Sequence, residues 1–578
     1  MLYVITMGGN IMDISKTLFK RYAECENIFS LDQIHRFKFE NNYDNEKVKE
    51  MLMKMFDENG EDQIDFSDEQ IEVMLPYYQK VEEIALKEAN IKFNKPFVYY
   101  PNTLDQKSFS FKDNEGNNLY TYLDGYYEDD NEIIIIEVKA STDSKILKLG
   151  PKVDGIINPI FEKENQIIKI KKKLDTKQIK HLNKIYDKKN DIGKYFYDLA
   201  ITNYIIKNCN LKKNVKYYLA FLNSKYIFDG SFINGEPSYY NGSKQIISFV
   251  EATDLLDGYY EIINNDHKKI QAIINDTNLN KPKYKKECKE CVYKNICFDN
   301  LNDKYLILNI MGAKQIKKIN VIDYYNQGIQ YLKEINFDDL ENERQQIQYQ
   351  SLTEIEVINK DGLKRKINEI KYPIYHLDFE AFNGPLPRFF GEKPYAQSLF
   401  QYSIHIERLP GICDKFKDNY SFVASDFSDR REELVKNMID IIDLSNGGTV
   451  LVYNKTYESS RIIELIGLFP QYKDKLQKIL DNIYDLKDVL DGGKGCSLNY
   501  YHRDMEGKYS IKKVLPVLSN LSYKDLNIHN GVEAIINYAK FRYLEKEDIE
   551  ELRKNLIEYC GLDTYSMFVI LEGIKKKI

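Results

Sequence analysis

The stretch YPIYHLDFEAF, residues 372–382, alternates apolar and polar side chains over most of its length. Such alternation predicts a β-strand, because successive side chains of a strand point to opposite faces. His376, Asp378 and Glu380 therefore share one face, and the apolar residues between them share the other. Two carboxylates on one face of a buried strand repel each other, and a bound cation relieves that cost. The stretch predicts the first strand of a C-terminal α/β domain with an acidic site on it.

Two later segments add acidic residues to this prediction. GGTVLVYNKTYESSRIIELIGLF, residues 447–469, predicts a buried strand followed by an amphipathic helix, with Glu458 at the junction. LIEYCGLDTYSMFVIL, residues 556–571, predicts a helix. Tyr559 and Asp563 are four residues apart in it, so they lie on one helix face. Each segment is weak evidence alone, and their order along the chain is the stronger signal.

In order and character, these three segments resemble the motifs of the DEDD exonuclease superfamily, and the tyrosine is typical of its DEDDy branch, which includes polymerase proofreading domains. The resemblance implies an RNase H-like fold, a 3′→5′ exonuclease and two divalent cations, Mg²⁺ or Mn²⁺. Tyr559 is implied to position the attacking water. Glu458 stands where the superfamily usually has Asp, and Asp485 is interpreted as a residue at the edge of the core rather than a ligand. The implied metal ligands are Asp378, Glu380, Glu458 and Asp563.

A second acidic constellation lies in the N-terminal half. NEIIIIEVKAST, residues 131–142, predicts a buried strand, on which Glu137 and Lys139 share a face. Asp124 ends a preceding strand in LDGYY. Two carboxylates on adjacent strand ends can share a hard cation such as Mg²⁺, and a neighbouring lysine can orient the attacking water. For Glu-Val-Lys alone, a solvent-exposed ion pair is the alternative.

The spacing Asp-x12-Glu-x-Lys resembles the core of the PD-(D/E)xK nucleases, and the predicted helix YDLAITNYII resembles the helix that follows this core in the RecB-like branch. The resemblance implies a catalytic site of Asp124, Glu137 and Lys139, with the two carboxylates holding the metal. In that branch a Gln and a Tyr face the site. Tyr204 matches the Tyr, and Thr202 stands in place of the Gln.

Three of the eight cysteines fall within CKECVYKNIC, residues 288–297. Cys288, Cys291 and Cys297 supply three soft ligands, and a tetrahedral metal or a four-iron cluster needs a fourth. RecB-like nucleases of the CRISPR-associated and AddB types carry one cysteine before the core and three after it, as Cys25 and the later trio do here. The resemblance implies a [4Fe–4S] cluster on these four residues, with Zn²⁺ on the same ligands or a redox-inert cluster as alternatives. The remaining cysteines are predicted to be buried small apolar residues: Cys209, Cys413, Cys496 and Cys560.

The chain has 578 residues, enough for two or three domains. Residues 96–145 predict strands, beginning with KPFVYY, and residues 355–370 a possible hairpin. The predicted class is α/β, with three parts: a RecB-like PD-(D/E)xK (restriction-endonuclease-like) domain with the four-cysteine cluster over 1–300, a helical connector over 301–370, and an RNase H-like DEDDy exonuclease domain over 371–578. Nearly the whole chain resembles a bacterial family known as domain of unknown function 2779, whose members join these two halves.

The amino-acid composition limits which cellular compartment and which binding partners we expect. The chain is 43% hydrophobic and 30% charged, contains no apolar run of the roughly 20 residues that span a bilayer, and begins without the features of a secretory signal. Its cysteine usage predicts a reducing cytoplasm. A net charge of −7 argues against bulk attraction of nucleic acid, although lysine-rich segments at 163–189 and 281–289 could form local patches or plain solvated faces.

The leading hypothesis is a metal-dependent nuclease acting on nucleic acid, DNA in preference to RNA, with two active sites. A nucleic-acid-binding scaffold protein with one or both sites degenerate is the alternative, favoured by Thr202 and Glu458. A third hypothesis, an iron–sulphur redox sensor, rests on the cysteines alone.

Overall fold

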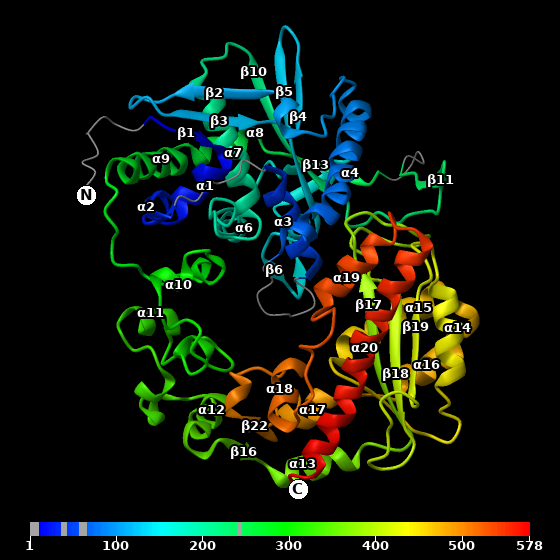
Figure 1. Ribbon diagram of the computed structural model, residues 1–578. Coiled ribbons are helices and arrows are strands. Elements are labelled where there is room, and N and C mark those ends of the chain that lie inside the picture. Colours follow the sequence, from blue (N-terminus) through cyan, green and yellow to red (C-terminus); the bar gives the residue numbers. More distant parts are fainter. Residues whose placement is uncertain (1–10, 36–42, 57–65, 240–244) are drawn as a thin grey trace. The chain divides into compact units, whose positions relative to one another are not determined.

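The computed structural model describes residues 11–35, 43–56, 66–239 and 245–578, which form two compact units (Figure 1). The first unit is Met1–Lys281 with Gly384–Ala396, and the second is Pro282–Asn383 with Gln397–Ile578. Each unit combines helices with β-sheet, which confirms the predicted mixed α/β class. The predicted connector and the cysteine trio lie within the second unit, and Cys25 lies within the first.

A six-stranded mixed sheet with strand order β4-β5-β10-β13-β9-β8 is the centre of the first unit. The pairs β5–β10 and β13–β9 are parallel, and the other neighbours are antiparallel. Its strands are β4 (Gly125–Glu128), β5 (Glu132–Thr142), β8 (Phe161–Glu164), β9 (Ile167–Ile170), β10 (Asn214–Leu222) and β13 (Ile247–Glu251). A smaller sheet, β1-β3-β2, contains β1 (Asp13–Ser15), β2 (Ser108–Lys112) and β3 (Asn118–Tyr122). Two short hairpins are β6 (Lys152–Val153) with β7 (Ile156–Ile157) and β11 (Phe232–Ile233) with β12 (Glu236–Pro237).

The α-helices of this unit are α1 (Lys16–Glu24), α2 (Ile28–Ile34), α3 (Tyr43–Phe56), α4 (Asp68–Phe93), α5 (Ser144–Leu147), α6 (Thr176–Leu182), α7 (Gly193–Asn208), α8 (Thr253–Leu256) and α9 (Tyr260–Asn275). Helix α4 begins with a capping box, in which Ser67 and Gln70 satisfy each other's backbone N–H groups. Helices α3 and α4 contact β5, and α7 contacts β10. These contacts direct side chains from three helices toward the acidic strand β5.

The segment 384–396 belongs to the first unit although it lies between two strands of the second in sequence. The Tyr239 hydroxyl donates to the Pro387 carbonyl at 2.8 Å, and the Phe228 amide donates to the Glu392 carbonyl at 2.8 Å. These bonds fix the segment against residues of its own unit.

A five-stranded sheet with order β19-β18-β17-β20-β21 is the centre of the second unit. Strands β17, β20 and β21 run parallel to one another, whereas β18 is antiparallel to both β17 and β19. Its strands are β17 (Ile374–Phe382), β18 (Ser398–Glu407), β19 (Asn419–Val423), β20 (Thr449–Val452) and β21 (Ile483–Asp485). The short pairs are β14 (Gln315–Ile316) with β15 (Ile319–Asn320) and β16 (Glu356–Ile358) with β22 (Tyr500–His502).

The α-helices of the second unit are α10 (Lys294–Cys297), α11 (Val321–Asn326), α12 (Glu343–Glu354), α13 (Lys360–Asn368), α14 (Arg431–Ile441), α15 (Lys455–Leu468), α16 (Lys473–Asp481), α17 (Leu486–Asp491), α18 (Ile511–Leu518), α19 (Gly531–Lys540) and α20 (Lys546–Lys575). The long final helix and the strand-to-helix turn from β20 to α15 are confirmed as predicted.

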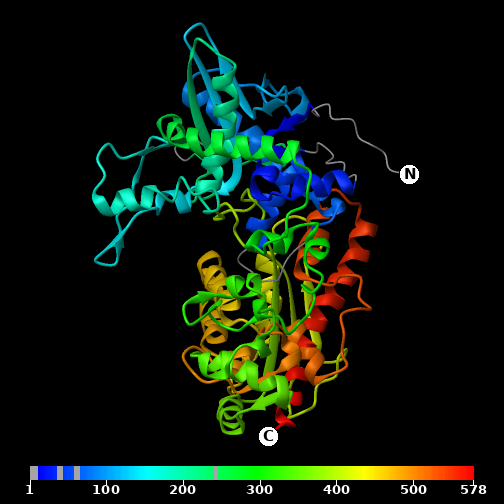
Figure 2. The ribbon, with the colours of Figure 1, turned by 90° about the vertical axis from the view of Figure 1, so that its left-hand side faces the viewer.

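The two faces of β17 pack against different helices. Leu377 and Phe379 join one apolar core with Leu434 and Val435 of α14 and Ile462 of α15. The opposite, polar face is covered by α20, which contacts β17, β18 and β19. Figure 2 shows this layering, with the sheet between α20 in red and the yellow helices α14–α16. The alternation of residues 372–382 therefore sorts apolar side chains to one layer and acidic side chains to the other.

Two secondary-structure predictions are wrong. Residues 96–100 form no strand, because Pro96 and Pro101 flank the run and proline cannot donate to a strand ladder. The predicted hairpin at 355–370 is instead β16 followed by helix α13. The Asn359 side chain accepts the Gly362 amide at 3.0 Å and so caps the start of that helix.

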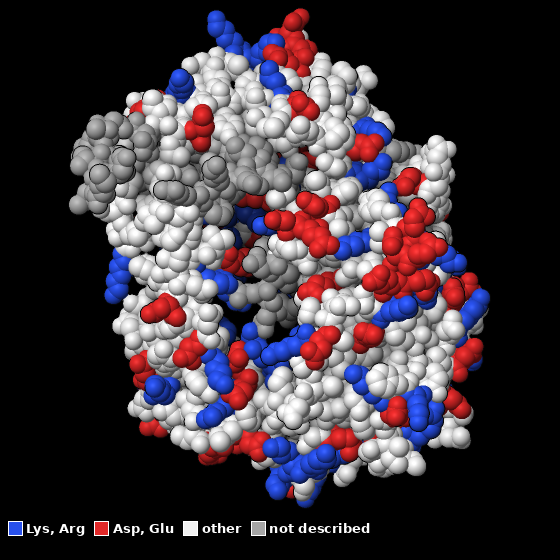
Figure 3. All heavy atoms as spheres, viewed as in Figure 1, with Lys and Arg blue, Asp and Glu red and all other residues white. Residues whose placement is uncertain are grey.

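In the described ranges, the helices are all too short or too polar to cross a bilayer. On the face shown in Figure 3, basic and acidic side chains both occur widely, consistent with a small net charge. Lys163 pairs with Asp143 at 3.1 Å and Lys188 pairs with Asp266 at 2.7 Å. Part of the positive charge of the lysine-rich segment 163–189 is thus neutralised locally.

Candidate functional site

Acidic residues from three elements converge on the polar face of β17. Asp378, Glu380 and Cys560 each place one potential ligand atom within 4.8 Å of the others. The Cys560 thiol, on α20, donates to Asp378 Oδ2 at 3.4 Å. Strand β17 shifts its register with β18 immediately after Glu380. Strand and helix therefore bring residues 180 positions apart in sequence to one point.

Glu458 and Asp563 belong to the same neighbourhood. Glu458 is in the first turn of α15, directly after β20, and is 2% exposed, while Asp563 on α20 is 8% exposed. Burial raises the pKa of Asp378 well above its usual value, and the Asp563 carboxylate raises it further. Burial likewise raises the pKa of Glu458, with added repulsion from Asp378 and then Asp485. The predicted carboxylates are close enough to oppose one another's ionisation.

The donor set fits a hard divalent cation. The Glu458 Oε2 atom is buried and has no hydrogen-bond partner in the described part of the protein. A buried carboxylate oxygen without a partner is costly, and a cation between repelling carboxylates removes both costs. Asp378, Glu380, Glu458 and Asp563 offer the oxygen ligands that Mg²⁺ and Mn²⁺ accept.

Two tyrosines and one further aspartate surround these carboxylates. The Tyr523 hydroxyl donates to Asp563 Oδ1 at 2.6 Å, and the Tyr523 and Tyr559 rings are 6.2 Å apart. Asp485 accepts the backbone amides of Lys455 and Lys487, each at 2.9 Å. Asp485 therefore caps α17, and its interpretation as a core-edge residue rather than a ligand stays a prediction.

Asp124, Glu137 and Lys139 also come together, in the first unit. Asp124 Oδ2 accepts the Val138 amide at 2.8 Å, which holds Asp124 beside the neighbours of that residue on β5. Lys139 Nζ donates to Glu137 Oε1 at 3.1 Å. The strand alternation thus places the Glu–Lys pair as predicted, and both side chains are buried rather than solvent-exposed.

Lysines from the N-terminal helices contact this cluster. Lys16 Nζ is 2.9 Å from both oxygens of Glu137. Lys47 Nζ lies 2.5 Å from Asp124 Oδ1 and 2.8 Å from Glu82 Oε1. Ammonium groups therefore occupy the positions beside these carboxylates that a metal ligand set would offer to a cation.

Asp198 of α7 completes the network. It accepts a hydrogen bond from Lys139, and Lys20 Nζ lies 3.1 Å from its Oδ1 atom. Burial acts to raise the pKa of Asp198, but Lys139 and Lys16 hold that pKa well below its usual value. Burial opposes ionisation of Asp124 too, yet Lys47 and Lys16 hold its pKa below the usual value. The charges of Asp124 and Asp198 are therefore already compensated by neighbouring ammonium groups.

Sequence reasoning missed several of these side chains. Asp198 lies in YDLAITNYII, the same predicted helix as Thr202 and Tyr204. Its position on that helix was the signal that could have identified it. Glu82 lies four residues after Tyr78 on the long helix α4, and both are buried. The lysine partners carry no motif and come from distant helices. In the second unit, Cys560 and Tyr523 were missed, although Cys560 adjoins Tyr559.

The two residues expected to support the N-terminal site bond elsewhere. The Tyr204 hydroxyl lies 3.0 Å from His267 Nδ1, and His267 Nε2 lies 3.0 Å from Asp113 Oδ2. The buried Thr202 hydroxyl lies 3.3 Å from the Thr121 hydroxyl. On α7, it is Asp198 that reaches Lys139.

The cysteine trio lies on a short turn and on α10. Cys288 Sγ accepts the Lys285 amide at 3.3 Å, and all three residues are half-buried. Cys288 and Cys297 pack against an apolar cluster that includes Tyr284. Such thiols fit a thiolate-bound group, and the pairing with the half-buried Cys25 stays a prediction. Among the other cysteines, burial is confirmed for Cys413 and Cys560, Cys209 is half-buried, and Cys496 is exposed in a glycine-containing loop.

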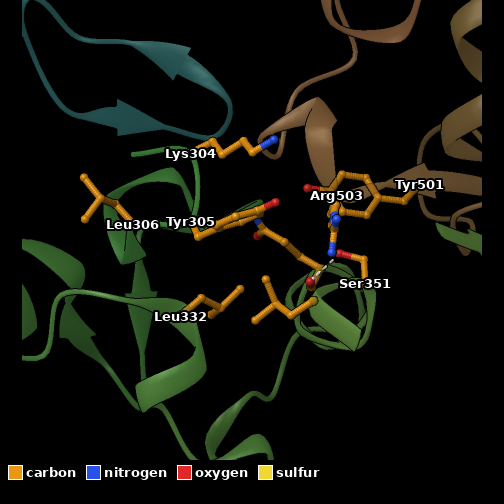
Figure 4. A pocket seen from close by; sticks show the side chains of 9 residues that line it. Lys304, Tyr305, Leu306, Leu332, Ser351, Tyr501 and Arg503 are labelled. Atoms are coloured by element: carbon orange, nitrogen blue, oxygen red, sulfur yellow. Dashed lines mark hydrogen bonds between the residues drawn. The ribbon is translucent and has the colours of Figure 1, made fainter. Parts of the chain in front are cut away.

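Two of the cavities in the described part of the protein lie outside these clusters. A depression of about 360 Å³ in the first unit is lined by Lys145, Lys148, His181 and Lys184, and also by Asp191, which pairs with Lys145 at 2.7 Å. The cavity in Figure 4, in the second unit, measures about 10 Å³ and includes Tyr305, Ser351 and Arg503 in its lining. The latter volume is that of about one water molecule, so we place no organic ligand there.

The fold and its acidic clusters define a two-unit α/β protein with a carboxylate-rich candidate metal site in the second unit. Residues 375–510 match the family model described as "Domain of unknown function (DUF2779)", and this segment contains Asp378, Glu380 and Glu458. The match, with the two relatives below, supports the predicted resemblance to that family.

Two curated proteins are similar over part of the chain. "Uncharacterized protein UU173" of Ureaplasma parvum is 28% identical over 225 residues, which cover 36% of this chain and 32% of that protein. "Uncharacterized protein MG366" of Mycoplasma genitalium is 26% identical over 229 residues, 37% of this chain and 34% of that protein. The chain thus spans about a third of the length of these relatives. No solved structure matches it.

Proposed function

We propose that the second unit is a metal-dependent phosphodiester hydrolase that removes nucleotides from the 3′ end of a nucleic-acid strand, DNA in preference to RNA. The observation that carries the proposal is the proximity of Asp378, Glu380 and Asp563, together with a buried Glu458 oxygen that has no hydrogen-bond partner among the described residues. Support also comes from the strand order β19-β18-β17-β20-β21, with the acidic strand in the middle, as an RNase H-like fold would have it.

The residues of this site would have different roles in hydrolysis. Asp378, Glu380, Glu458 and Asp563 would hold Mg²⁺ or Mn²⁺. When bound, such ions lower the pKa of the attacking water and stabilise charge on the phosphate oxygens. Tyr559, buried beside Tyr523, would orient that water, and the Tyr523 hydroxyl holds one oxygen of Asp563 in place.

For the first unit we propose a RecB-like nuclease site of Asp124, Glu137 and Lys139, with Asp198 fixing the lysine. A divalent cation there would displace Lys16 or Lys47 from the carboxylates. The depression, whose lining includes Lys148 and Lys184 besides the Lys145–Asp191 pair, supports nucleic acid as the partner, because phosphates bind clustered lysines. Cys25 and the trio would hold a [4Fe–4S] cluster, or Zn²⁺, with a mainly structural role.

A second candidate function has its own supporting observation. Because Lys16 and Lys47 already compensate the carboxylates of the first unit, this unit can be a nucleic-acid-binding scaffold without cleavage. In that case the second unit alone cleaves, or neither unit does.

The test is a cleavage panel over 3′-labelled and 5′-labelled oligonucleotides, single- and double-stranded, of DNA and RNA, with Mg²⁺ or Mn²⁺. We expect the full chain to shorten strands from the 3′ end and Asp378→Ala to lose at least about 100-fold in rate. Asp124→Ala in parallel reports on the first unit. Absence of cleavage by the wild type on every substrate would leave the scaffold function. Anaerobically purified protein should be brown if the cluster is iron–sulphur, and colourless with stoichiometric zinc if it is not.

A further inference from the structure

The acidic cluster of the second unit contains a sulphur ligand as well as oxygen ligands. Cys560 is fully buried on α20, and its thiol lies 3.4 Å from Asp378 Oδ2. The same sulphur is within 4.8 Å of a Glu380 oxygen. It therefore belongs to a set of three potential ligands gathered from a strand and a helix.

The spacing of these atoms suits a tetrahedral thiophilic ion. With zinc–sulphur and zinc–oxygen bonds of about 2.3 and about 2.1 Å, a sulphur and an oxygen bound to one Zn²⁺ are about 3.6 Å apart. The observed Sγ···Oδ2 separation is 3.4 Å. Mg²⁺, in contrast, takes oxygen ligands in octahedral geometry and does not select thiolates.

A second observation also points to a cation at this site. Glu458 is 2% exposed, its Oε2 atom has no hydrogen-bond partner within the described ranges, and its carboxylate is close enough to Asp378 to be repelled by it. Buried oxygens of this kind are normally satisfied by hydrogen bonds or by a metal.

We propose that Asp378, Glu380 and Cys560 form a binding site for a thiophilic divalent cation of the Zn²⁺ class, and that this ion displaces Mg²⁺ or Mn²⁺ and switches the second unit off. The switching rests on the hydrolase proposed above, whereas the binding does not. Binding replaces the thiol proton by the metal and releases that proton to solvent.

Zinc titration of the full chain tests the site without any substrate. Wild type is compared with Cys560→Ala and with Cys413→Ala, which removes another buried cysteine of the same unit while the cysteine trio stays intact. We expect wild type and Cys413→Ala to bind one more Zn²⁺ than Cys560→Ala, or to bind it more than about 10-fold more tightly. Equal stoichiometry and affinity in all three proteins overturns the proposal.

Cys560→Ser is the second variant, because it keeps the size and hydrogen bonding of the side chain and lacks the thiolate. Co²⁺ bound to the wild type should show a thiolate charge-transfer band that is weaker in Cys560→Ser and unchanged in Cys413→Ala. A band of equal strength in wild type and Cys560→Ser counts against the site.

Inhibition is measured on the 3′-labelled strand in Mg²⁺, with each variant normalised to its own zinc-free rate. Zn²⁺ should slow wild type and Cys413→Ala at concentrations at least about 10-fold below those needed for Cys560→Ala. If neither wild type nor any variant cleaves the strand, the proposed hydrolase function is wrong, and the zinc stoichiometry still tests the metal site. If cleavage occurs but the zinc count and inhibition do not depend on Cys560, the zinc site fails and the hydrolase stands.

Discussion

In the first unit the carboxylates lie against lysines, whereas in the second unit Asp378 and Glu458 lie against other carboxylates. Lys47 holds Asp124 in the first unit, and the pKa of that carboxyl is lowered. In the second unit the pKa values of Asp378 and Glu458 are raised. Similar acidic motifs on buried strands have thus opposite electrostatic surroundings.

This electrostatic difference means that the first cluster is compensated without a metal, whereas the second requires a bound cation. Buried carboxylates paired with ammonium groups are stable without metal, and a metal must compete with those groups. Buried carboxylates that repel one another lower stability until a cation arrives. We therefore expect divalent cations to act first on the second unit.

The largest expected effect is the removal of a lysine from the first cluster. Lys47→Met removes the ammonium group that contacts both buried carboxylates, Asp124 and Glu82, and should lower the free energy of unfolding by about 3–5 kcal/mol. Hydrogen exchange of first-unit peptides in the full chain measures the loss. The matched control is Lys95→Met, which breaks the more exposed pair with Asp129 and should lower the free energy of unfolding far less. Equal effects of the two variants would contradict the account. If Mg²⁺ restores the stability of Lys47→Met, these carboxylates accept a metal.

The acidic clusters of the two units should respond to pH in opposite directions; Glu88 lies outside the first cluster, and burial raises the pKa of its carboxyl to about 7. Asp378 and Glu458 have raised pKa values, so in EDTA the folded second unit holds more protons than the unfolded chain from about pH 4 upward, and its stability falls as pH rises through those raised values. Asp124 and Asp198 have lowered pKa values, so the first unit loses stability as pH falls below about 4.

Unit-resolved hydrogen exchange in EDTA, corrected for the intrinsic rate at each pH, measures both slopes. For each proton by which the folded and unfolded states differ, the free energy of unfolding changes by about 1.4 kcal/mol per pH unit. Mg²⁺ should flatten the slope of the second unit alone. A slope of the second unit that Mg²⁺ leaves unchanged, or a first unit that keeps its full stability below about pH 4, would refute the comparison.

A smaller effect is expected from the tyrosine that orients Asp563. Tyr523→Phe removes the hydroxyl that donates to Asp563 at 2.6 Å and should weaken Mn²⁺ binding about 10-fold. Tyr543→Phe, at a tyrosine that is 55% exposed, is the control and should bind Mn²⁺ like wild type. Unchanged affinity in Tyr523→Phe would place Asp563 outside the metal site.

The smallest effect is a gain in stability. Asp378→Asn removes a repelling carboxylate and should raise the free energy of unfolding of the second unit in EDTA. Asp440→Asn, at a side chain that is 75% exposed, should change it by less than about 0.5 kcal/mol. Destabilisation by Asp378→Asn would mean that the carboxylates are compensated in some other way.

How far the sequence predicts this molecule depends on the range of the interactions. Alternation along residues 372–382 predicts β17 and its acidic face, and the four-residue spacing of Tyr559 and Asp563 predicts their shared helix face. Both are local periodicities. They suffice to place the acidic residues of the second unit on the correct elements.

The rest depends on contacts between distant segments. Lys16 and Lys47 meet β5 only through tertiary packing, and nothing local to either lysine predicts it. Cys560 appears in sequence as a small apolar residue of a helix, and only the packing of α20 on β17 makes it a neighbour of Asp378. The two clusters differ in whether neighbouring ammonium groups compensate their carboxylates. Sequence motifs therefore could not predict this difference.

The most direct measurement is Mn²⁺ binding to the full chain near neutral pH, followed by electron paramagnetic resonance for wild type, Asp378→Ala and Asp440→Ala. If the repelling carboxylates of the second unit are a divalent-cation site, wild type and Asp440→Ala bind Mn²⁺ alike, and Asp378→Ala binds at least about 10-fold more weakly or holds fewer ions. Identical Mn²⁺ stoichiometry and affinity in all three proteins would contradict the account.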